Sequence, residues 1–131
     1  MTTFIDGSAA VSMLLLETDA DDLLERLDSD GDRIWSAIAQ WEAIAAFRRA
    51  REVEPELARA SVTELATRLD FRLVTIGAAE ATSAYDAFAR YGKGRHPAAL
   101  NMGDCFAYAC AKTNDARLLY KGDDFSHTDL A

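Results

Sequence analysis

The stretch LNMGDCFAYACAK, residues 100–112, places an acid at the head of a long apolar run. Nearly every residue from Cys105 to Ala111 is apolar, which is typical of a helix buried in a core. Asn101 is a favoured N-cap residue, so the stretch predicts a helix over residues 101–113. Asp104 is then the third helical residue, where a carboxylate completes a capping box or offsets the helix dipole. Taken alone, this position favours a structural role for Asp104.

Segments rich in β-branched and aromatic residues alternate with helical segments along the rest of the chain. Strands are predicted at residues 2–6, 33–35, 71–76 and 117–120, and helices at 9–16, 19–27, 37–51, 56–69 and 78–91. Ser8 is a suitable N-cap for the first of these helices. Strands separated by helices predict βαβ units. We therefore expect an α/β fold in a single domain spanning residues 1–131, with a mostly parallel central sheet of four to five strands flanked by helices.

The composition is that of a globular protein without membrane segments. Half of the residues are hydrophobic, and no apolar run approaches the roughly 20 residues of a membrane-spanning helix. The N-terminus has no basic segment before its apolar residues, so we expect a cytoplasmic protein that does not enter a membrane. Cys105 and Cys110 would point in different directions on a helix, which predicts two buried, reduced thiols.

The 22 acidic residues give the chain a net charge of −8. This charge argues against broad adhesion to nucleic acid and favours a basic partner, although it does not exclude a nuclease whose carboxylates bind metal. Residues 28–32, DSDGD, resemble the opening of an EF-hand calcium loop. Arg33 and Ala39 stand where that loop needs glycine and glutamate, so we expect a solvated turn there.

A smaller group of acids lies in apolar surroundings, where a carboxylate is costly unless it is paired or binds metal. These acids are Asp6, Glu42, Asp104 and either Asp123 or Asp124. Each has a structural alternative: a helix cap for Asp6 and Asp104, an arginine pair for Glu42, and a turn for residues 122–124. The carboxyl ends of parallel strands meet at one edge of a sheet, so the acids that follow strands should lie close together. Mg²⁺ or Mn²⁺ would relieve their repulsion and could polarise a phosphate and activate water.

Five short motifs follow one another in order along essentially the whole chain. They are FIDGSA at residues 4–9, WE at 41–42, YGKGRHP at 91–97, LNMGDCFAY at 100–108, and LLYKGDDF with TD at 118–125 and 128–129. With these motifs the chain resembles the PIN-domain family, and more narrowly the VapC toxins of bacterial toxin–antitoxin pairs. The joined series between residues 92 and 125 is highly specific, and it implies a PIN-like fold.

The resemblance implies a Mg²⁺- or Mn²⁺-dependent endoribonuclease. Residues that match the catalytic and metal-binding acids of the family are Asp6, Glu42, Asp104 and Asp124, with Asp123 as a further candidate ligand. Ser8 matches the small hydroxyl residue beside the first aspartate. Gly7 departs from the threonine that many relatives carry, and the short end at Ala131 is expected to curtail a final edge strand.

Basic side chains near the predicted site could hold an RNA backbone. The candidate substrate-binding residues are Ser8, Lys93, Arg95 and Lys121, while His96 and His127 receive no role. A solvated loop is the alternative for the basic residues. The resemblance also implies a cognate VapB-type antitoxin, a homodimer and a toxin–antitoxin hetero-oligomer, and a net charge of −8 suits a partner that sends a cation towards the acids.

Other classes of protein could use the same acids. A catalytically inactive PIN-like binding module would only dock a basic segment of a partner on them, and metal-dependent cleavage distinguishes it from the enzyme. An aspartyl-phosphate hydrolase built on Asp6 needs a second acid two residues later, where this chain has Ser8. A receiver domain needs an acidic pair after the first strand and a late lysine, which this order of motifs fits poorly.

Overall fold

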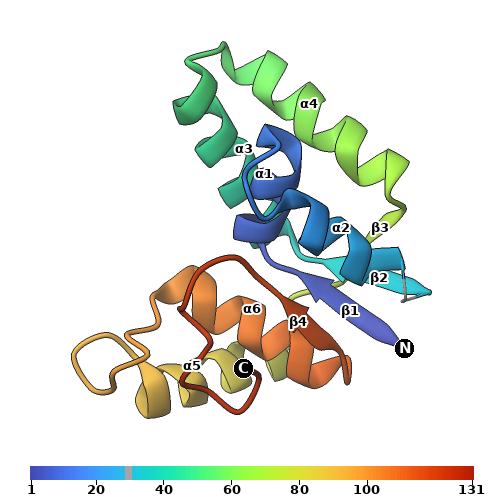
Figure 1. Cartoon of the computed structure of the whole chain (residues 1–131). Coiled ribbons are helices and arrows are strands. Elements are labelled where there is room, and N and C mark those ends of the chain that lie inside the picture. The colour runs from blue at the N-terminus through green and yellow to red at the C-terminus, as the bar shows by residue number, and fades with distance from the viewer. Residues whose placement is uncertain (29–30) are drawn as a thin grey trace.

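The computed structural model describes residues 1–28 and 31–131 of the chain (Figure 1). Strands and helices alternate along this part of the chain, as the sequence predicts. Their order and bounds are β1 Thr2–Ile5, α1 Gly7–Leu15, α2 Ala20–Asp28, β2 Asp32–Trp35, α3 Ala37–Arg51, α4 Pro55–Arg68, β3 Phe71–Leu73, α5 Ala78–Tyr91, α6 Met102–Thr113 and β4 Arg117–Leu119. No helix in the described residues has both the length and the apolar character needed to cross a bilayer.

The four described strands form one parallel sheet in the order β3-β2-β1-β4. β1 lies inside the sheet, where Phe4 pairs with Ile34 of β2 on one side and with Leu118 of β4 on the other. Phe4, Ile5 and Ile34 have no solvent exposure, as expected for strands covered on both faces. The predicted parallel α/β sheet is therefore confirmed, and the residues that follow β1 and β4 emerge at the same edge.

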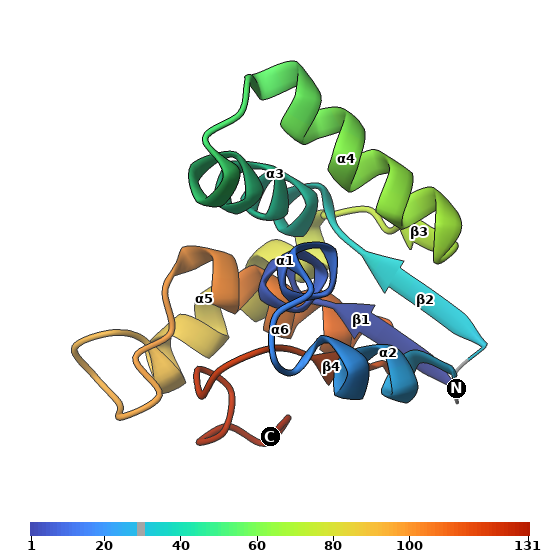
Figure 2. The ribbon, with the colours of Figure 1, turned by 45° about the horizontal axis from the view of Figure 1, so that its top comes forward.

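The helices cover the two faces of the sheet in separate groups. α1 to α4 pack against one another on one side, and α5 and α6 form a tight pair on the other (Figures 1 and 2). α6 lies against β1 and β4. Its residues from Gly103 to Cys105 and from Ala107 to Ala111 are buried. The apolar run predicted to be core is therefore core, and it fixes the start of α6 next to the edge of the sheet.

Local hydrogen bonds define where the helices near this edge begin. Ser36 caps α3 by accepting a hydrogen bond from the Ala39 N–H at 3.1 Å. Asn101 and Asp104 form a reciprocal capping box at α6, with hydrogen bonds of 2.9 and 3.1 Å. Each bond satisfies a backbone donor that the helix itself leaves unpaired, so each helix starts at a defined residue.

Some sequence predictions of element boundaries are wrong. Ser8 does not cap α1, because α1 starts at Gly7, two residues earlier than predicted, and Asp6 is the N-cap. β3 ends at Leu73 instead of Ile76, since it lies at the edge of the sheet with a neighbour on one side only. Residues 29 and 30 of the turn predicted over 28–32 lie outside the described residues, while Asp28 ends α2 and Asp32 begins β2.

The C-terminal segment is held by side chains rather than by strand pairing. The Asp129 carboxylate accepts hydrogen bonds from Tyr108 and Lys112 of α6, each at 2.6 Å. Although burial raises the pKa of Asp129, these bonds lower it to about 2. In the described part of the chain β4 is the last strand, and residues 123–130 form turns and bends. The expected shortening of a final edge strand stays a prediction.

Candidate functional site

Asp6 is the first acid that the sheet positions. It follows β1 directly, and its backbone N–H donates to the Leu119 carbonyl of β4 at 2.9 Å. Its side chain is only 6% exposed and accepts hydrogen bonds from both the backbone N–H and the hydroxyl of Ser8. The helix-cap alternative for Asp6 is therefore present in the structure, and the same geometry fixes the carboxylate at the carboxyl edge of the sheet.

Ser8 connects Asp6 to the loop that follows β4. Its hydroxyl donates to the Asp6 carboxylate and accepts from the Lys121 backbone N–H at 3.1 Å. These bonds join residues more than a hundred positions apart in the sequence and orient the loop that carries Asp124. The Ser8 hydroxyl is thus occupied within the protein, and its predicted contact with substrate stays a prediction.

Glu42 reaches the same edge from α3. Its side chain is half-buried, and its carboxylate packs over Gly103 so closely that a Cβ added there would collide with it. Gly7 is needed for a related reason: its added Cβ would lie 2.8 Å from the Ala39 carbonyl oxygen. Small residues therefore let α1 and α6 approach α3 closely.

Asp104 stands at the start of α6 opposite Glu42. One of its oxygens closes the capping box with Asn101, and the residue is 8% exposed. Asp104 therefore does have the structural role of capping α6. The burial of a second carboxylate near Asp6 is still unexplained by capping, because an exposed acid would serve a cap equally well.

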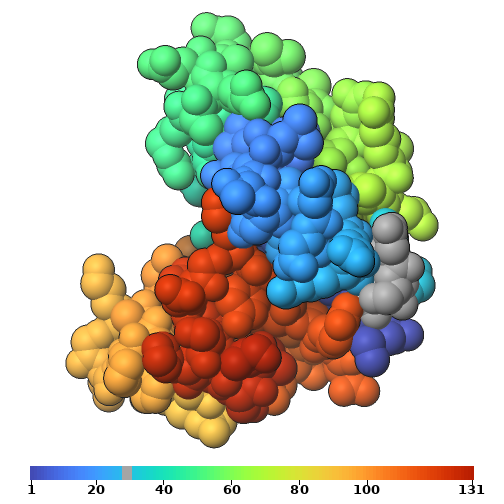
Figure 3. Space-filling view, in the orientation of Figure 1, coloured from blue at the N-terminus to red at the C-terminus, as the bar shows by residue number. Residues whose placement is uncertain are grey.

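The acids line one cleft of about 340 Å³. In the space-filling view the surface is indented between the segments around α3 and α1 and those of α6 and the last loop (Figure 3). The residues that line the cleft are Asp6, Gly7, Ser8, Val11, Trp41, Glu42, Ala45, Ala46, Arg49, Asn101, Asp104 and Asp124. α1, α3, α6 and the loop after β4 thus bring together four of the five predicted acids.

Burial and mutual repulsion raise the pKa values of Asp6, Glu42 and Asp104. The pKa of Glu42 is raised to about 7 by burial and then by the charges of Asp6 and Asp104. Burial likewise raises the pKa of Asp104 to about 6, with Asp124 and Asp6 adding to the effect. Burial raises the pKa of Asp6 in spite of its hydrogen bonds with Ser8, and Asp124 raises it further. The carboxylates therefore interact electrostatically although they come from distant parts of the sequence.

The donor set suits a hard divalent cation in type and charge. All four side chains offer carboxylate oxygens, the ligands that Mg²⁺ and Mn²⁺ prefer, and a cation between them would remove the repulsion that contributes to the raised pKa values of Asp6, Glu42 and Asp104. Within residues 1–28 and 31–131, no three acidic, histidine or cysteine side chains already converge tightly enough to hold one ion. Glu42 and Asp124 are the two less buried acids of the cleft.

Several predicted residues do not reach the cleft. Asp123 is not among the residues that line it, and the loop after β4 contributes Asp124. Lys121 pairs with Glu17 at 3.0 Å and lies 3.8 Å from Asp19, and Lys93 and Arg95 are exposed on the loop between α5 and α6. None of these three basic residues lines the cleft.

The cleft instead contains a cation that the sequence analysis missed. Arg49 lies seven residues after Glu42, two helical turns along the same side of α3, and Trp41 precedes Glu42. The sequence could have placed Arg49 at the site through its spacing from Glu42, because residues seven apart share a helix face.

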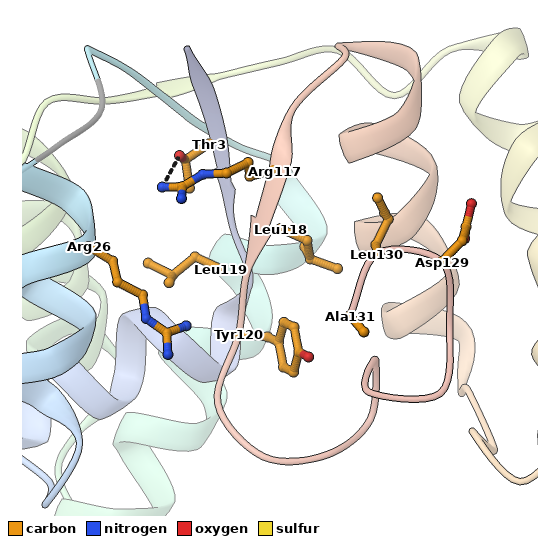
Figure 4. Close-up of a pocket in the computed structure, with 9 residues that line it drawn as sticks. All are labelled: Thr3, Arg26, Arg117, Leu118, Leu119, Tyr120, Asp129, Leu130 and Ala131. Carbon is orange, nitrogen blue, oxygen red and sulfur yellow. Dashed lines mark hydrogen bonds between the residues drawn. The ribbon is translucent and has the colours of Figure 1, made fainter.

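A second hollow lies on the far side of β4, between α2 and the C-terminal segment (Figure 4). Its volume of about 330 Å³ is similar to that of the cleft, and the Arg117 guanidinium in it donates to the Thr3 hydroxyl. It contains none of the four clustered acids, and its only carboxylate side chain, Asp129, is already bound by Tyr108 and Lys112. The acidic cleft is thus the better candidate for a catalytic site.

The acidic cleft lies at the carboxyl edge of a parallel α/β sheet, which is where such folds bind ligands. Comparison with known proteins identifies the family. The PIN domain model matches residues 3–130. A VapC ribonuclease of Rhizobium meliloti strain 1021 is 43% identical over 140 residues, covering 98% of this chain and 99% of the relative. Ribonuclease VapC30 of Mycobacterium tuberculosis is 39% identical over 133 residues, covering 97% and 95%.

The fold agrees with a solved structure of the same family. The crystal structure of Mycobacterium tuberculosis VapC20, described as a sarcin-ricin loop cleaving toxin, superposes with a TM-score of 0.70. It shares 18% sequence identity, and the match covers 98% of this chain and 96% of that one. The chain belongs to the PIN-domain family and is related to its VapC ribonucleases.

Substitution of Glu42 by glutamine tests the crowding of the acids. Glu42 has a pKa near 7 in the folded protein against 4.5 ordinarily, so the folded state binds its proton more tightly and stability falls as the pH rises between these values. Without added metal, Glu42→Gln should raise the free energy of unfolding at pH 8 by roughly 1–3 kcal/mol and change it little at pH 4.5. Urea denaturation at both pH values measures this.

The matched control is Glu25→Gln, which removes an exposed acid from α2. It should leave the free energy of unfolding nearly unchanged at both pH values. Equal stabilities of the Glu42→Gln variant and the wild type at pH 8 would contradict the electrostatic account of the cleft.

Proposed function

We propose that this protein is a Mg²⁺- or Mn²⁺-dependent endoribonuclease and the toxin of a type II toxin–antitoxin pair. The observation that carries the proposal is the burial of Asp6 and Asp104, with Glu42 and Asp124, around one cleft in a chain of the PIN-domain family. Relatives that align over nearly the whole chain are named as ribonucleases, which supports RNA as the substrate.

In this proposal Asp6 and Asp104 are the principal metal ligands, and Glu42 and Asp124 complete the set. Bound Mg²⁺ or Mn²⁺ supplies Lewis-acid polarisation of the phosphate and lowers the pKa of water. The hydrogen bonds from Ser8 and Asn101 keep the two principal carboxylates in place before substrate arrives. The N-terminus of α6 adds backbone dipoles that favour the negative charge of a phosphate.

Glu42 is the acid best suited to take up the proton of the attacking water. No hydrogen bond holds its carboxylate within the described residues, whereas Asp6 and Asp104 are both held. In hydrolysis the water oxygen bonds to phosphorus, one ribose oxygen leaves, and a proton must reach that oxygen. An oxygen of the deprotonated Glu42 carboxylate that is not bound to metal would accept this proton, provided that it lies within hydrogen-bond reach of the water.

The partners follow from the same charge distribution. We propose a cognate VapB-type antitoxin whose basic segment enters the acidic cleft, because the chain carries a net charge of −8 and its acids gather there. Assembly as a homodimer, and as a hetero-oligomer with the antitoxin in the cytoplasm, belongs to the same proposal.

The proposal is tested by cleavage of tRNA, rRNA and mRNA in Mg²⁺, Mn²⁺ or EDTA. We expect cleavage with metal and none in EDTA. Asp6→Asn and Asp104→Asn should lower kcat/KM by roughly a hundredfold or more while retaining the circular dichroism of the wild type. The neighbouring pair Asp124→Asn and Asp123→Asn supplies the matched comparison, since only Asp124 lines the cleft.

Three results would count against the enzyme. Cleavage that survives EDTA, or that is unchanged in both the Asp6 and Asp104 variants, would place the activity elsewhere. Equal losses in the Asp123 and Asp124 variants would contradict the assignment of Asp124. Tight binding of a basic partner without cleavage of any RNA would favour the inactive binding module.

Gly103→Ala separates the position of Glu42 from the stability of the fold. The added methyl group would displace the end of the Glu42 side chain, which can move, while alanine has the higher helix propensity. We expect the free energy of unfolding to change by less than about 1 kcal/mol and kcat/KM to fall by roughly a hundredfold. Urea denaturation and RNA cleavage measure the two effects, and wild-type cleavage by this variant would contradict a role for Glu42.

A further inference from the structure

One side of α3 carries a stripe of residues that the acids do not explain. Trp41, Ala45 and Arg49 follow one another at intervals of four residues, and all three line the acidic cleft. Residues at this spacing lie along one face of a helix. The stripe begins beside Glu42, the residue after Trp41, and continues about 12 Å along the helix to Arg49.

Trp41 is exposed although it is the largest apolar side chain on this surface. Its relative exposure is 69%, whereas Trp35, the other tryptophan of the chain, is 1% exposed in the core. Single exposed apolar residues are common, but this indole borders a cleft beside catalytic acids. An aromatic face in that position is suited to stack on a flat, unpaired ring.

Arg49 is the cation at the other end of the stripe. It is exposed in the last turn of α3, and no carboxylate within residues 1–28 and 31–131 forms an ion pair with it. A planar guanidinium without a protein partner is suited to a phosphate. Val11 and Ala46 are further apolar residues that line the cleft.

We propose that Trp41 and Arg49 form a nucleotide-binding platform for single-stranded RNA beside the reacting phosphate. A base stacks on the Trp41 ring, the sugar lies over the apolar residues that line the cleft, and Arg49 binds a phosphate further along the strand. This inference rests on the proposed ribonuclease function and assigns its substrate contacts. Both are positioning residues, because neither is among the acids proposed to act on the reacting phosphate.

Single-stranded RNA fits this surface better than a protein segment does. A basic segment of a partner would bind at the acids, whereas Arg49, with Arg48 and Arg51 in the same last turn of α3, favours an anionic strand at this end of the stripe. A nucleic-acid strand carries both a ring for the indole and a negative charge for the guanidinium. Stacking also tolerates any base, so the platform would add affinity without requiring a particular sequence.

Tryptophan fluorescence tests the platform without relying on cleavage. We would titrate the full-length protein in Ca²⁺ with adenine and uracil hexaribonucleotides, checking on a gel that the RNA stays intact. Because Trp35 is buried, stacking should quench mainly the fluorescence of Trp41. We expect saturable quenching, with tighter binding of the adenine hexamer because its rings stack more strongly.

The variants distinguish stacking from a structural effect. Trp41→Ala should weaken binding about tenfold, measured by fluorescence anisotropy of labelled RNA, while Trp41→Phe retains an aromatic face and most of the affinity. Arg49→Ala should weaken binding and reduce the slope of log affinity against log salt by about 0.7. Arg48→Ala removes an equal charge from the same turn but lies off the cleft, and it should change affinity little.

Cleavage kinetics then separate this inference from the proposed function. In Mg²⁺, Trp41→Ala and Arg49→Ala should raise KM several-fold and leave kcat nearly unchanged. Quenching by RNA without any cleavage would support the platform and contradict the nuclease. Cleavage with wild-type KM in both variants, or failure of the wild type to bind either hexamer, would overturn the platform. Quenching by a hexa-arginine peptide but not by RNA would assign the surface to a protein partner and overturn it as well.

Discussion

The structure depends on holding several carboxylates close together at one edge of a parallel sheet. Asp6 and Asp104 are buried, and Glu42 packs against the backbone of Gly103 between them. Burial and mutual repulsion raise the pKa values of all three. Such an arrangement costs stability in the absence of a counter-charge, and the rest of the fold supplies the packing that keeps it in place.

The hydrogen bonds that begin the helices also orient the acids. Asp6 caps α1 and is linked through Ser8 to the backbone of Lys121, while Asp104 closes the capping box of α6. Structural and chemical roles therefore coincide in the same carboxylates. α3 adds two things to the sheet edge: Glu42, which joins the acids, and the stripe from Trp41 to Arg49, which lines the same cleft.

The sequence predicts those parts of the site that depend on local pattern. The strand before Asp6 and the apolar run after Asp104 place both acids, because burial and strand order follow from periodicity. The fourth acid is not decided by sequence, since Asp123 and Asp124 are adjacent and the conformation of the loop selects Asp124. Lys121 shows the same limit: its ion pair with Glu17 is a tertiary contact that removes it from the cleft. Arg49 could have been predicted from its helical spacing from Glu42. An exposed arginine in the last turn of a helix is common, however, and only the cleft beside it indicates a role in the site.

The central claim is that a divalent cation replaces protons in this cluster. Calorimetric titration of the metal-free protein with Mn²⁺ at pH 6.5, in two buffers of different ionisation enthalpy, measures the protons released on binding. Glu42 and Asp104, with pKa values of about 7 and about 6, are partly protonated at that pH. The account predicts saturable binding that releases protons, with the release reduced in Glu42→Gln. Binding without proton release, or no binding at all, would contradict it.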